Sequence, residues 1–452
     1  MGGTGVERPV KLASFRWAAA LFLCLCSGWP PALAQAGTVT VVTSLSQEMM
    51  RAYRVAFERQ HPGIRLEIVA KSTAELLREV EQRPAGKRPD IVWASSIEAF
   101  VLLARKGLLQ PAPELRNPQV PAKVGPHALN DASGRYFGQS LSGYGVMWNS
   151  DYLRQRQIRE PQEWQDLAQP AYAGHVVLSA PSRSGTTHLM VESMLQGLGW
   201  EQGWALLLQL AGNAAEITPD SYAVPRGIAR GSYGAGLVID AFGLAAKYSG
   251  MPVDFAYATM APVLPASIGL VAGALNPDEA KRFMAFTLSP PGQQLLLDPR
   301  INRLPVLPAA VLHMPAGYPD PYLQAQRSRL QFDVELSSTR YQLVSRLFDL
   351  VVTEPLAELQ AATHAIHAAD RALRGRASRQ GAALLASARK VAYTPVLPAV
   401  EAGSRQWLAA AGAPADAQWE RLQAIWSETA RNNYRRARQL AEQALVQAQA
   451  AP

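Results

Sequence analysis

The chain of 452 residues contains only two cysteines, Cys24 and Cys26, and both lie near its start. The remainder therefore has no thiol for a disulfide bond, a cysteine metal site or thiol catalysis. Histidine is also scarce, with seven residues in the chain. His364 and His367 are one helical turn apart, but no third ligand accompanies them. We therefore predict neither a metal site nor a cofactor.

Long apolar runs and runs of one charge are missing as well. No stretch approaches the roughly 18 uninterrupted apolar residues of a membrane-spanning helix, which predicts a soluble protein. The formal net charge is +8, but no run of five Lys or Arg residues occurs. Because nucleic-acid-binding chains usually cluster their basic residues, we expect no nucleic-acid partner.

The first 36 residues have the three-part pattern of a secretory signal peptide. Arg8, Lys11 and Arg16 precede the apolar run 17–26, and Ala32-Leu33-Ala34 is a small-residue cleavage site. We therefore expect cleavage after Ala34 and a periplasmic location. Leucine precedes each cysteine, which argues against lipid attachment.

Strand and helix patterns alternate from residue 38 onward. Residues 38–44, 64–71 and 89–96 predict strands, and each is followed by an amphipathic helical pattern. Capping boxes at 44–47 and 72–75 predict the starts of the first two helices. Such alternation is typical of parallel βαβ units, whose ligands lie outside the carboxyl ends of the strands.

The section after residue 135 continues this alternation. Residues 136–149 predict two short strands joined at Gly143, and residues 253–273 predict strands that return towards the first unit. Beyond about residue 315 the chain is rich in Ala, Gln, Leu and Arg with helical periodicity, which predicts several helices.

The sequence SAPSRSGTTH, residues 179–188, lies between a predicted strand and a predicted helix. It lacks the lysine and the first glycine of a nucleotide-binding P-loop. Ser184 lacks the two flanking glycines of a hydrolase elbow, and no acid that could orient His188 is identifiable. We therefore predict that the protein is not an enzyme.

Two interpretations of this stretch remain open. Ser184, Gly185, Thr186 and Thr187 can form an anion cradle with the free N–H groups of the helix start. Alternatively, Ser184 or Thr186 simply caps the helix. Polar residues at three other strand-to-helix turns favour the cradle. The candidate ligand-binding residues are Ser44, Ser46, Lys71, Ser72, Ser95, Ser96, Tyr144, Ser184, Gly185, Thr186, Thr187, His188 and Asp240.

Several of these candidates have a purely structural alternative. Tyr144 can stack on a ligand or pack in the core. Asp240 can accept a hydrogen bond from a ligand or cap the next helix. Arg183 and His188 can add positive charge, although Arg183 is equally suited to a solvated position.

The order of five motifs resembles that of the family 1 extracellular solute-binding proteins of ABC transporters, in the group that binds ferric ion, phosphonates and sugar phosphates. The motifs are VVTSLSQ, PDIVWASS, SGYGVMWN, VVLSAPSRSGTTH and YGAGLVIDAF. The resemblance covers residues 38–315 and implies an α/β, two-lobe type II periplasmic binding protein. The implied units are a signal peptide (1–36), lobe one (37–140 plus 265–315), lobe two (141–264) and an added helical C-terminal region (316–452).

The resemblance also implies a function. Ferric binders of this group place two tyrosines on a turn where this chain has Asp240, Ala241 and Phe242, which argues against iron. The retained serine-threonine cradle fits a small anionic ligand, namely a phosphorylated or phosphonate compound. We expect a monomer that closes its lobes on this ligand and delivers it to an ABC permease. The alternatives are a regulator that senses a phosphorylated metabolite such as phosphoglycerate and signals to a membrane sensor kinase, and a ferric-ion-binding protein.

Overall fold

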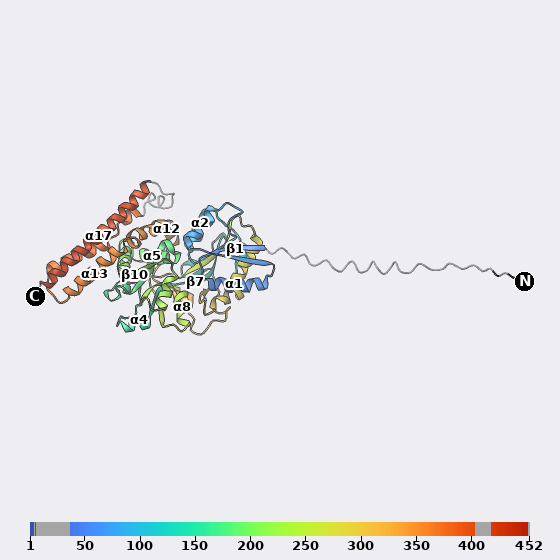
Figure 1. The fold of residues 1–452 in the computed structure, drawn as a ribbon, viewed down its shortest axis with the longest axis horizontal. Helices are drawn as coiled ribbons and strands as arrows, with labels where there is room; N and C mark the ends of the chain where they lie inside the picture. Colours follow the sequence, from blue (N-terminus) through green and yellow to red (C-terminus); the bar gives the residue numbers. More distant parts are fainter. Residues whose placement is uncertain (4, 6–36, 403–416, 451–452) are drawn as a thin grey trace.

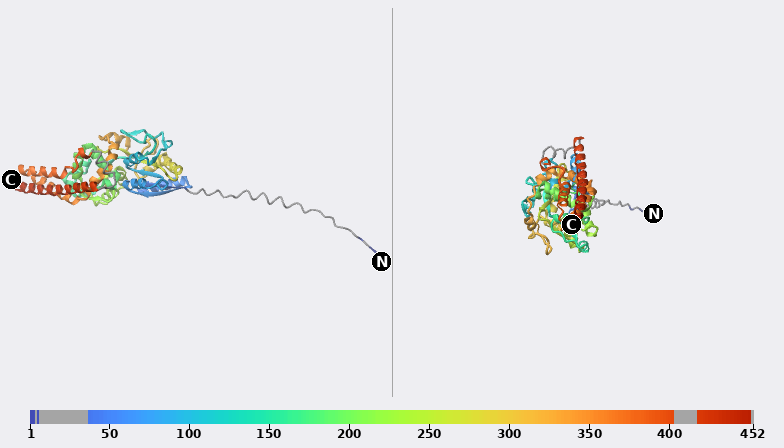
Figure 2. Two further views of the ribbon diagram at one scale, coloured as in Figure 1. Left: turned by 90° about the horizontal axis from the view of Figure 1, so that it is seen from above. Right: turned by 90° about the vertical axis from the view of Figure 1, so that its left-hand side faces the viewer.

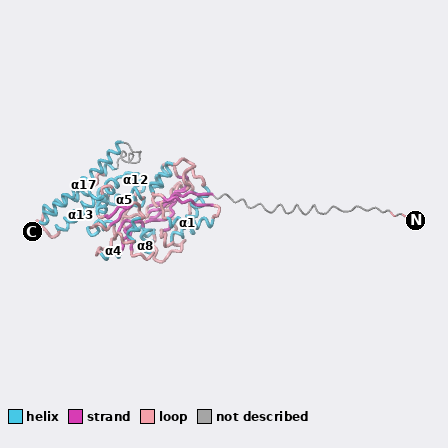
Figure 3. Tube along the Cα trace, viewed as in Figure 1, coloured by secondary structure: helices cyan, strands magenta, loops and turns pink. Residues whose placement is uncertain are grey.

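The computed structural model describes residues 1–3, 5, 37–402 and 417–450. The predicted signal peptide lies almost wholly outside these residues. Figure 1 shows a body of strands and helices and, at the end opposite β1, an arm made of long helices. Figure 3 shows that the strands are confined to the body. Within the described ranges, no helix combines the length and hydrophobicity needed to cross a membrane.

The first large sheet combines early and late parts of the chain. Its strands are β1 (Gly37–Thr43), β2 (Ile64–Ala70), β3 (Ile91–Ala94), β4 (Leu109–Gln110), β7 (Phe137–Ser142), β13 (Leu264–Val271) and β14 (Leu304–Pro305). Their order is β14-β7-β13-β3-β1-β2, with β4 against β13. β1 pairs in parallel with β2 and β3, as the predicted βαβ alternation requires, whereas β13 runs antiparallel to β3 and β7.

Helices complete this first lobe. They are α1 (Gln47–Gln60), α2 (Thr73–Gln82), α3 (Ile97–Arg105), α9 (Pro277–Leu288) and α10 (Pro290–Gln294). Short elements lie between them, namely η1 (Pro113–Leu115), β5 (Lys123–Val124), β6 (His127–Ala128) and η5 (Leu295–Leu297). We refer to the first sheet with these helices as the first lobe.

The helix starts of the first lobe test the predicted capping boxes. The box at 72–75 is confirmed, because the Ser72 hydroxyl accepts a bond from the Glu75 amide (3.3 Å) and the Glu75 carboxylate accepts one from the Ser72 amide (2.9 Å). The box at 44–47 is wrong. Ser46 has the extended backbone of an N-cap and its hydroxyl accepts from the Met49 amide (3.3 Å), so α1 begins two residues later than predicted.

The second sheet and its helices form the second lobe. Its strands are β8 (Tyr144–Asn149), β9 (Val176–Ser179), β10 (Ala214–Thr218), β11 (Ala235–Ile239) and β12 (Val253–Tyr257), in the order β10-β9-β11-β8-β12. The helices are α4 (Ser150–Gln155), η2 (Trp164–Ala168), η3 (Pro170–Tyr172), η4 (Pro181–Arg183), α5 (Gly185–Leu198), α6 (Trp200–Gly212), α7 (Ala223–Ala229) and α8 (Asp240–Tyr248).

The chain crosses between the two sheets at Gly143 and again between β12 and β13. Residues 253–257 do not return to the first sheet as predicted. They form β12, which pairs antiparallel with β8 in the second sheet, and only β13 returns. Gly143 is required at its crossing, because a Cβ there would lie 2.5 Å from a ring carbon of Tyr257.

The C-terminal region is helical, as predicted. It contains α11 (Pro321–Arg327), α12 (Val334–Phe348), the π-helical turn η6 (Asp349–Thr353), α13 (Leu356–Leu373), α14 (Arg379–Tyr393), α15 (Ala399–Ala402) and α17 (Ala417–Gln449). In the left view of Figure 2 the long helices α13 and α17 lie side by side and project from the body. Buried residues recur every three or four positions along α17, which packs this helix against α13 and α14.

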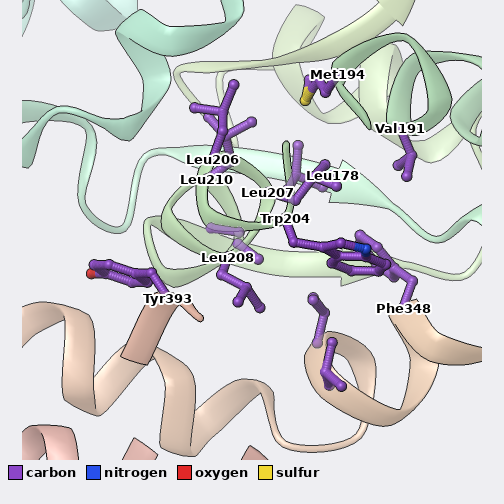
Figure 4. Packing of buried hydrophobic residues seen from close by; sticks show 14 of the residues in the cluster. Leu178, Val191, Met194, Trp204, Leu206, Leu207, Leu208, Leu210, Phe348 and Tyr393 are labelled. Carbon is purple, nitrogen blue, oxygen red and sulfur yellow. The ribbon is translucent and has the colours of Figure 1, made fainter. Parts of the chain in front are cut away.

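The arm shares one apolar core with the second lobe. Figure 4 shows Trp204 of α6 beside Phe348, with Leu208 directed towards the C-terminal helices. The Trp200 indole N–H, at the start of α6, donates to the carbonyl of Leu397 (2.7 Å). The arm is therefore built onto the second lobe rather than tethered to it by a linker.

Candidate functional site

A cavity of about 870 Å³ lies between the two lobes. The first lobe contributes wall residues from 43–48, 70–75 and 300–303, and the second from 183–186, 219–229 and 241–251. Most of these segments directly follow a strand, so the cavity lies at the strand ends where the βαβ pattern predicts a ligand. Its volume suits a small organic molecule.

Three helices begin at this cavity with a serine cap. The hydroxyls of Ser46, Ser72 and Ser184 accept bonds from amides in the first turns of α1, α2 and α5, at 3.2 to 3.3 Å. The capping interpretation is therefore realised at all three. A cap uses a lone pair of the hydroxyl oxygen and leaves its proton free. Ser72 donates that proton to Glu75 (2.7 Å), whereas no described residue accepts the protons of Ser46 and Ser184, which remain for another acceptor.

The start of α5 offers further donors. The amides of Gly185 and Thr186 are the first of the helix, and such amides have no partner within the helix itself. The amide of Thr187 is already used by the Ser184 cap. Gly185 also brings the lobes together, because a Cβ there would lie 2.6 Å from the Cβ of Ser96 in the first lobe. The positive end of α5 therefore meets the first lobe at the cavity wall.

Arg303 is a cavity residue that the sequence patterns did not indicate. It is 4% exposed, and its guanidinium donates to the hydroxyls of Ser95 (3.1 Å) and Ser142 (3.4 Å). Among the described residues no carboxylate lies within ion-pair distance of it. Because a guanidinium stays protonated, this is a buried positive charge with neutral hydrogen-bond partners, and the Asp240 carboxyl acts on it only from beyond ion-pair distance. The one signal in the sequence is that Arg303, with the neighbouring Asn302, interrupts the otherwise apolar stretch around residues 301–307.

The other charges of the cavity wall are mostly paired. Arg300 pairs with Asp298 (2.6 Å), Arg226 lies 3.7 Å from Asp220, and Arg183 donates to the backbone carbonyl of residue 218 (2.8 Å). Lys71, like Arg303, has no carboxylate within ion-pair distance in the described part of the chain. Arg183 also has no carboxylate within that distance among the described residues, so the wall has three cations, Lys71, Arg183 and Arg303, that a bound anion could neutralise.

Aromatic residues line the same cavity and were also not predicted. Tyr222 and Phe242 contact each other with ring centres 5.1 Å apart. The Tyr222 hydroxyl donates to the backbone carbonyl of Ser44 (2.7 Å), which links the second lobe to the first. Burial raises the pKa of Tyr222 to about 12, so this phenol stays a donor at neutral pH.

Asp240 and Tyr144 lie at the crossing between the lobes rather than in the cavity wall. The Asp240 carboxylate accepts bonds from the amides of Gly143 (2.7 Å) and Ala241 (2.8 Å) and from the hydroxyl of Tyr257 (3.2 Å). Burial raises its pKa to about 7. Tyr144 is fully buried, and its hydroxyl has no partner among the described residues.

His188 is directed towards the C-terminal helix α12, whereas Ser96 is the N-cap of α3 and lies next to Gly185. Ser96 donates to Glu98 (2.8 Å), and Nε2 of His188 lies 3.3 Å from the hydroxyl of Ser337. Burial lowers the pKa of His188 to about 4, so its imidazole is neutral at pH 7 and adds no charge to the cavity.

The structure thus divides the candidate residues into two sets. Those in the cavity wall are Ser44, Ser46, Lys71, Ser72, Ser184, Gly185 and Thr186. Those outside that wall are Ser95, Ser96, Tyr144, Thr187, His188 and Asp240. Ser95 still contacts the site indirectly, through Arg303. No group of three or more His, Cys, Asp or Glu side chains within the described ranges is arranged to hold a metal ion.

Comparison with known proteins places the chain among binding proteins. Residues 87–327 match the family described as bacterial extracellular solute-binding protein. The phosphoglycerate transport regulatory protein PgtC of Salmonella typhimurium is 34% identical over 264 residues, which are 57% of this chain and 63% of PgtC. The alignment therefore spans less than two thirds of that relative. An uncharacterized protein of Haemophilus influenzae is 24% identical over 276 residues, covering 57% of this chain and 75% of its own.

Solved structures share the fold at low identity. The periplasmic binding protein AfuA of Actinobacillus pleuropneumoniae, solved with fructose-6-phosphate, has a TM-score of 0.62 at 19% identity and covers 69% of this chain and 98% of its own. Iron-bound HitA of Pseudomonas aeruginosa has a TM-score of 0.57 at 18% identity, covering 69% and 98%. The predicted fold class, a two-lobe periplasmic binding protein with a helical C-terminal region, is confirmed.

Proposed function

Because this chain belongs to the bacterial extracellular solute-binding proteins, we propose that it binds a small phosphorylated or phosphonate compound in the periplasm and has no catalytic role. In this proposal lobe one is residues 37–140 with 265–315, lobe two is residues 141–264, and the lobes close on the ligand. The observation that carries the proposal is the buried charge of Arg303 in the wall of the interlobe cavity, with no described carboxylate within ion-pair distance.

The chemistry of the cavity supports an anionic ligand. A phosphate or phosphonate group has several acceptor oxygens and no donors when fully ionised. The free hydroxyl protons of Ser46 and Ser184, the first amides of α5 and the cations Lys71 and Arg303 are all donors. A guanidinium can hold two such oxygens at once, which makes Arg303 well suited to this group.

The aromatic pair of Tyr222 and Phe242 supports a ligand larger than inorganic phosphate. An apolar or ring-shaped part of a compound can pack on these side chains while its anionic group faces Arg303. Two similar proteins bear names consistent with such ligands, since AfuA was solved with fructose-6-phosphate and PgtC is named for phosphoglycerate transport. Delivery to an ABC permease then follows from the family.

A regulatory role is the second candidate. The family match ends at residue 327, so α12 and all later helices lie beyond it. Delivery of a ligand to a permease needs only the two lobes, whereas a sensor needs an output surface, which the arm could supply to a membrane partner.

A ferric-ion role has less support, because the turn at Asp240–Phe242 has no tyrosine and the Asp240 carboxylate is already occupied by three donors.

A thermal-shift screen of the purified protein tests the proposal. Fructose-6-phosphate, 3-phosphoglycerate and 2-aminoethylphosphonate are compared with fructose and glycerate, which lack the phosphoryl group. A ligand at 100 times its Kd adds about 2.7 kcal/mol of stability. We expect stabilisation by at least one phosphorylated or phosphonate compound and none by the two controls.

Substitution of Arg303 tests whether a ligand that stabilises the protein binds in the cavity. Arg303→Ala should abolish the ligand-induced shift. Arg88→Ala is the matched control, because Arg88 also lies in the first lobe, donates only to backbone carbonyls and is outside the cavity. Equal stabilisation of the Arg303→Ala variant and the wild type would exclude Arg303 as the anion receptor. Stabilisation only by ferric ion or by unphosphorylated compounds would overturn the proposed ligand class.

A further inference from the structure

Helix α12 lies across both lobes. It packs against α3 of the first lobe and against α5 and η4 of the second. Figure 1 shows it beside α5. α12 then continues through the π-helical turn η6 into α13 of the arm. One helix of the C-terminal region is therefore in contact with both halves of the proposed binding site.

The centre of this contact is a buried polar junction. The Ser337 hydroxyl on α12 donates to the Glu98 carboxylate on α3 (2.7 Å) and lies 3.3 Å from Nε2 of His188 on α5. All three residues are fully buried. A proton on Nε2 of His188 lets that nitrogen donate to the Ser337 oxygen while the Ser337 hydroxyl donates to Glu98. A single hydroxyl group thus joins a carboxylate of one lobe to an imidazole of the other.

Charged contacts extend the junction towards the first lobe. Glu335 of α12 forms an ion pair with Arg105 at the end of α3, and Arg105 also donates to the Thr339 hydroxyl (3.4 Å). These side chains are partly exposed, so each contributes less than a buried contact. They attach the end of α3 to α12, whereas Ser337 attaches the start of α3 to α12.

Contacts with the second lobe are stronger. Arg340 of α12 forms two hydrogen bonds with the buried carboxylate of Glu192 on α5 (2.7 and 2.8 Å). The Tyr341 ring packs on His188 with centroids 4.2 Å apart. Two-point contact between a guanidinium and a carboxylate fixes both position and orientation. α12 is thus oriented by the second lobe and reaches the first lobe through Ser337 and Glu335.

The same helices that contact α12 also reach the ligand cavity. α5 begins in the cavity wall with Gly185, and His188 and Glu192 follow one and two turns later. Ser96, the N-cap of α3, lies against Gly185 and donates to Glu98. A change in the angle between α3 and α5 must therefore break the Ser337 junction or move α12.

We propose that α12 is an interlobe clamp, which restrains the separation of the lobes and couples the arm to the cavity. Opening the lobes would leave the buried Glu98 and His188 without their shared hydroxyl, so the clamp opposes opening. The existence of the clamp rests on these contacts alone. Its consequence, that clamp release controls ligand entry, rests on the proposed function.

Lobe separation in the ligand-free protein tests the clamp directly. The chain has no cysteine after Cys26, so a background without Cys24 and Cys26 accepts spin labels at Arg78→Cys on α2 and Arg230→Cys beside α7. Pulsed electron paramagnetic resonance then gives the distribution of distances between the lobes. In a Glu335→Ala/Ser337→Ala variant we expect this distribution to broaden and shift to longer distances.

A matched control removes the same residue types elsewhere on the C-terminal helices. Ser387→Ala/Glu442→Ala affects only bonds within α14 and α17, and its distribution should equal that of the wild type. If the double variant folds poorly, Arg105→Ala replaces it. This substitution breaks the ion pair with Glu335 from the first lobe, and it should shift the distance distribution in the same direction. Equal distributions in clamp variants and control would overturn the proposal and show that α12 moves with the second lobe alone.

Stopped-flow binding of fructose-6-phosphate measures the consequence for ligand entry. We expect faster association in the clamp variant than in the control. If this compound does not bind, fructose-6-phosphate is not a ligand of this protein, while the distance measurement still decides the clamp. If it binds both variants at the same rate, the clamp does not control entry.

Discussion

At the scale of single residues, burial assigns roles that residue type alone does not. Arg303 and Arg300 are three positions apart in one loop, yet Arg300 is exposed and paired with Asp298, whereas Arg303 is buried among hydroxyls. Glu98 and Asp240 are carboxyls whose burial raises the pKa to about 7 in each case. We therefore expect the buried Glu98 and Asp240 to respond to pH near neutrality and the buried Arg303 to respond to an anion, unlike exposed residues of the same types.

Glu98→Gln should remove part of the pH dependence of stability. The pKa of Glu98 is raised from 4.5 to about 7, mainly by burial, so its protonated form is the one that the fold favours. Its contribution to stability is complete below pH 4.5 and is lost as the pH rises through 7. The amide cannot ionise, so the variant should gain on the wild type with rising pH, by up to about 3 kcal/mol above pH 8.

Urea unfolding at pH 5, 6, 7 and 8 measures this difference. Asp240 and the buried histidines titrate in both proteins, so their contributions cancel when the two free energies of unfolding are subtracted. A constant difference across this range would contradict the raised pKa of Glu98.

At the scale of elements, the sequence predicts local features well and tertiary ones poorly. The alternation of strands and helices and the Ser72–Glu75 cap depend on neighbouring residues, and both are present. The start of α1 is shifted, because Ser44 and Ser46 are equally good caps and the fold selects Ser46. The bond of Arg303 to Ser95 and the contact of His188 with Ser337 each join residues far apart in the chain. A local sequence pattern carries no signal for such contacts.

The start of α5 combines a structural and a proposed binding role, and a double variant separates them. Ser184→Ala/Thr186→Ala should lower affinity for a phosphorylated ligand about 100-fold or more, because bonds to a charged group are worth about 1.5 to 3 kcal/mol each. Loss of the Ser184 cap should also lower stability by about 1 kcal/mol.

Ser378→Ala is the control for the cap. Ser378 caps α14 on the arm by accepting from the Gly381 amide (3.1 Å), far in sequence from the cavity segments. Isothermal titration calorimetry and thermal unfolding of both variants should show equal losses of stability and a loss of affinity only in the double variant. Unchanged affinity of a folded double variant would leave Ser184 as a helix cap and nothing more.

At the scale of the whole molecule, the arm and the second lobe share one apolar core. Phe348, Tyr393 and Trp426 belong to the same apolar cluster as Trp204 and Leu207 of α6. A large apolar face of the second lobe is therefore covered only when the C-terminal helices are present, so the lobes cannot be assumed to retain their stability without the arm.

Deletion of residues 329–452 should accordingly do more than remove an output surface. Exposure of α6 should lower the thermal midpoint and increase binding of a hydrophobic dye such as anilinonaphthalene sulfonate. Thermal unfolding with dye fluorescence measures both. A truncated protein as stable as the full chain, without dye binding, would show that the shared core is not needed.

The shared core also dictates the order in which the chain can mature. The first sheet is completed by β13 and β14 from the middle of the chain, and the second lobe is covered by α17 at its very end. A chain that emerges amino end first therefore cannot finish either lobe during most of its synthesis. The surfaces that β13, β14 and α17 cover in the finished protein therefore stay exposed until those late segments have been made.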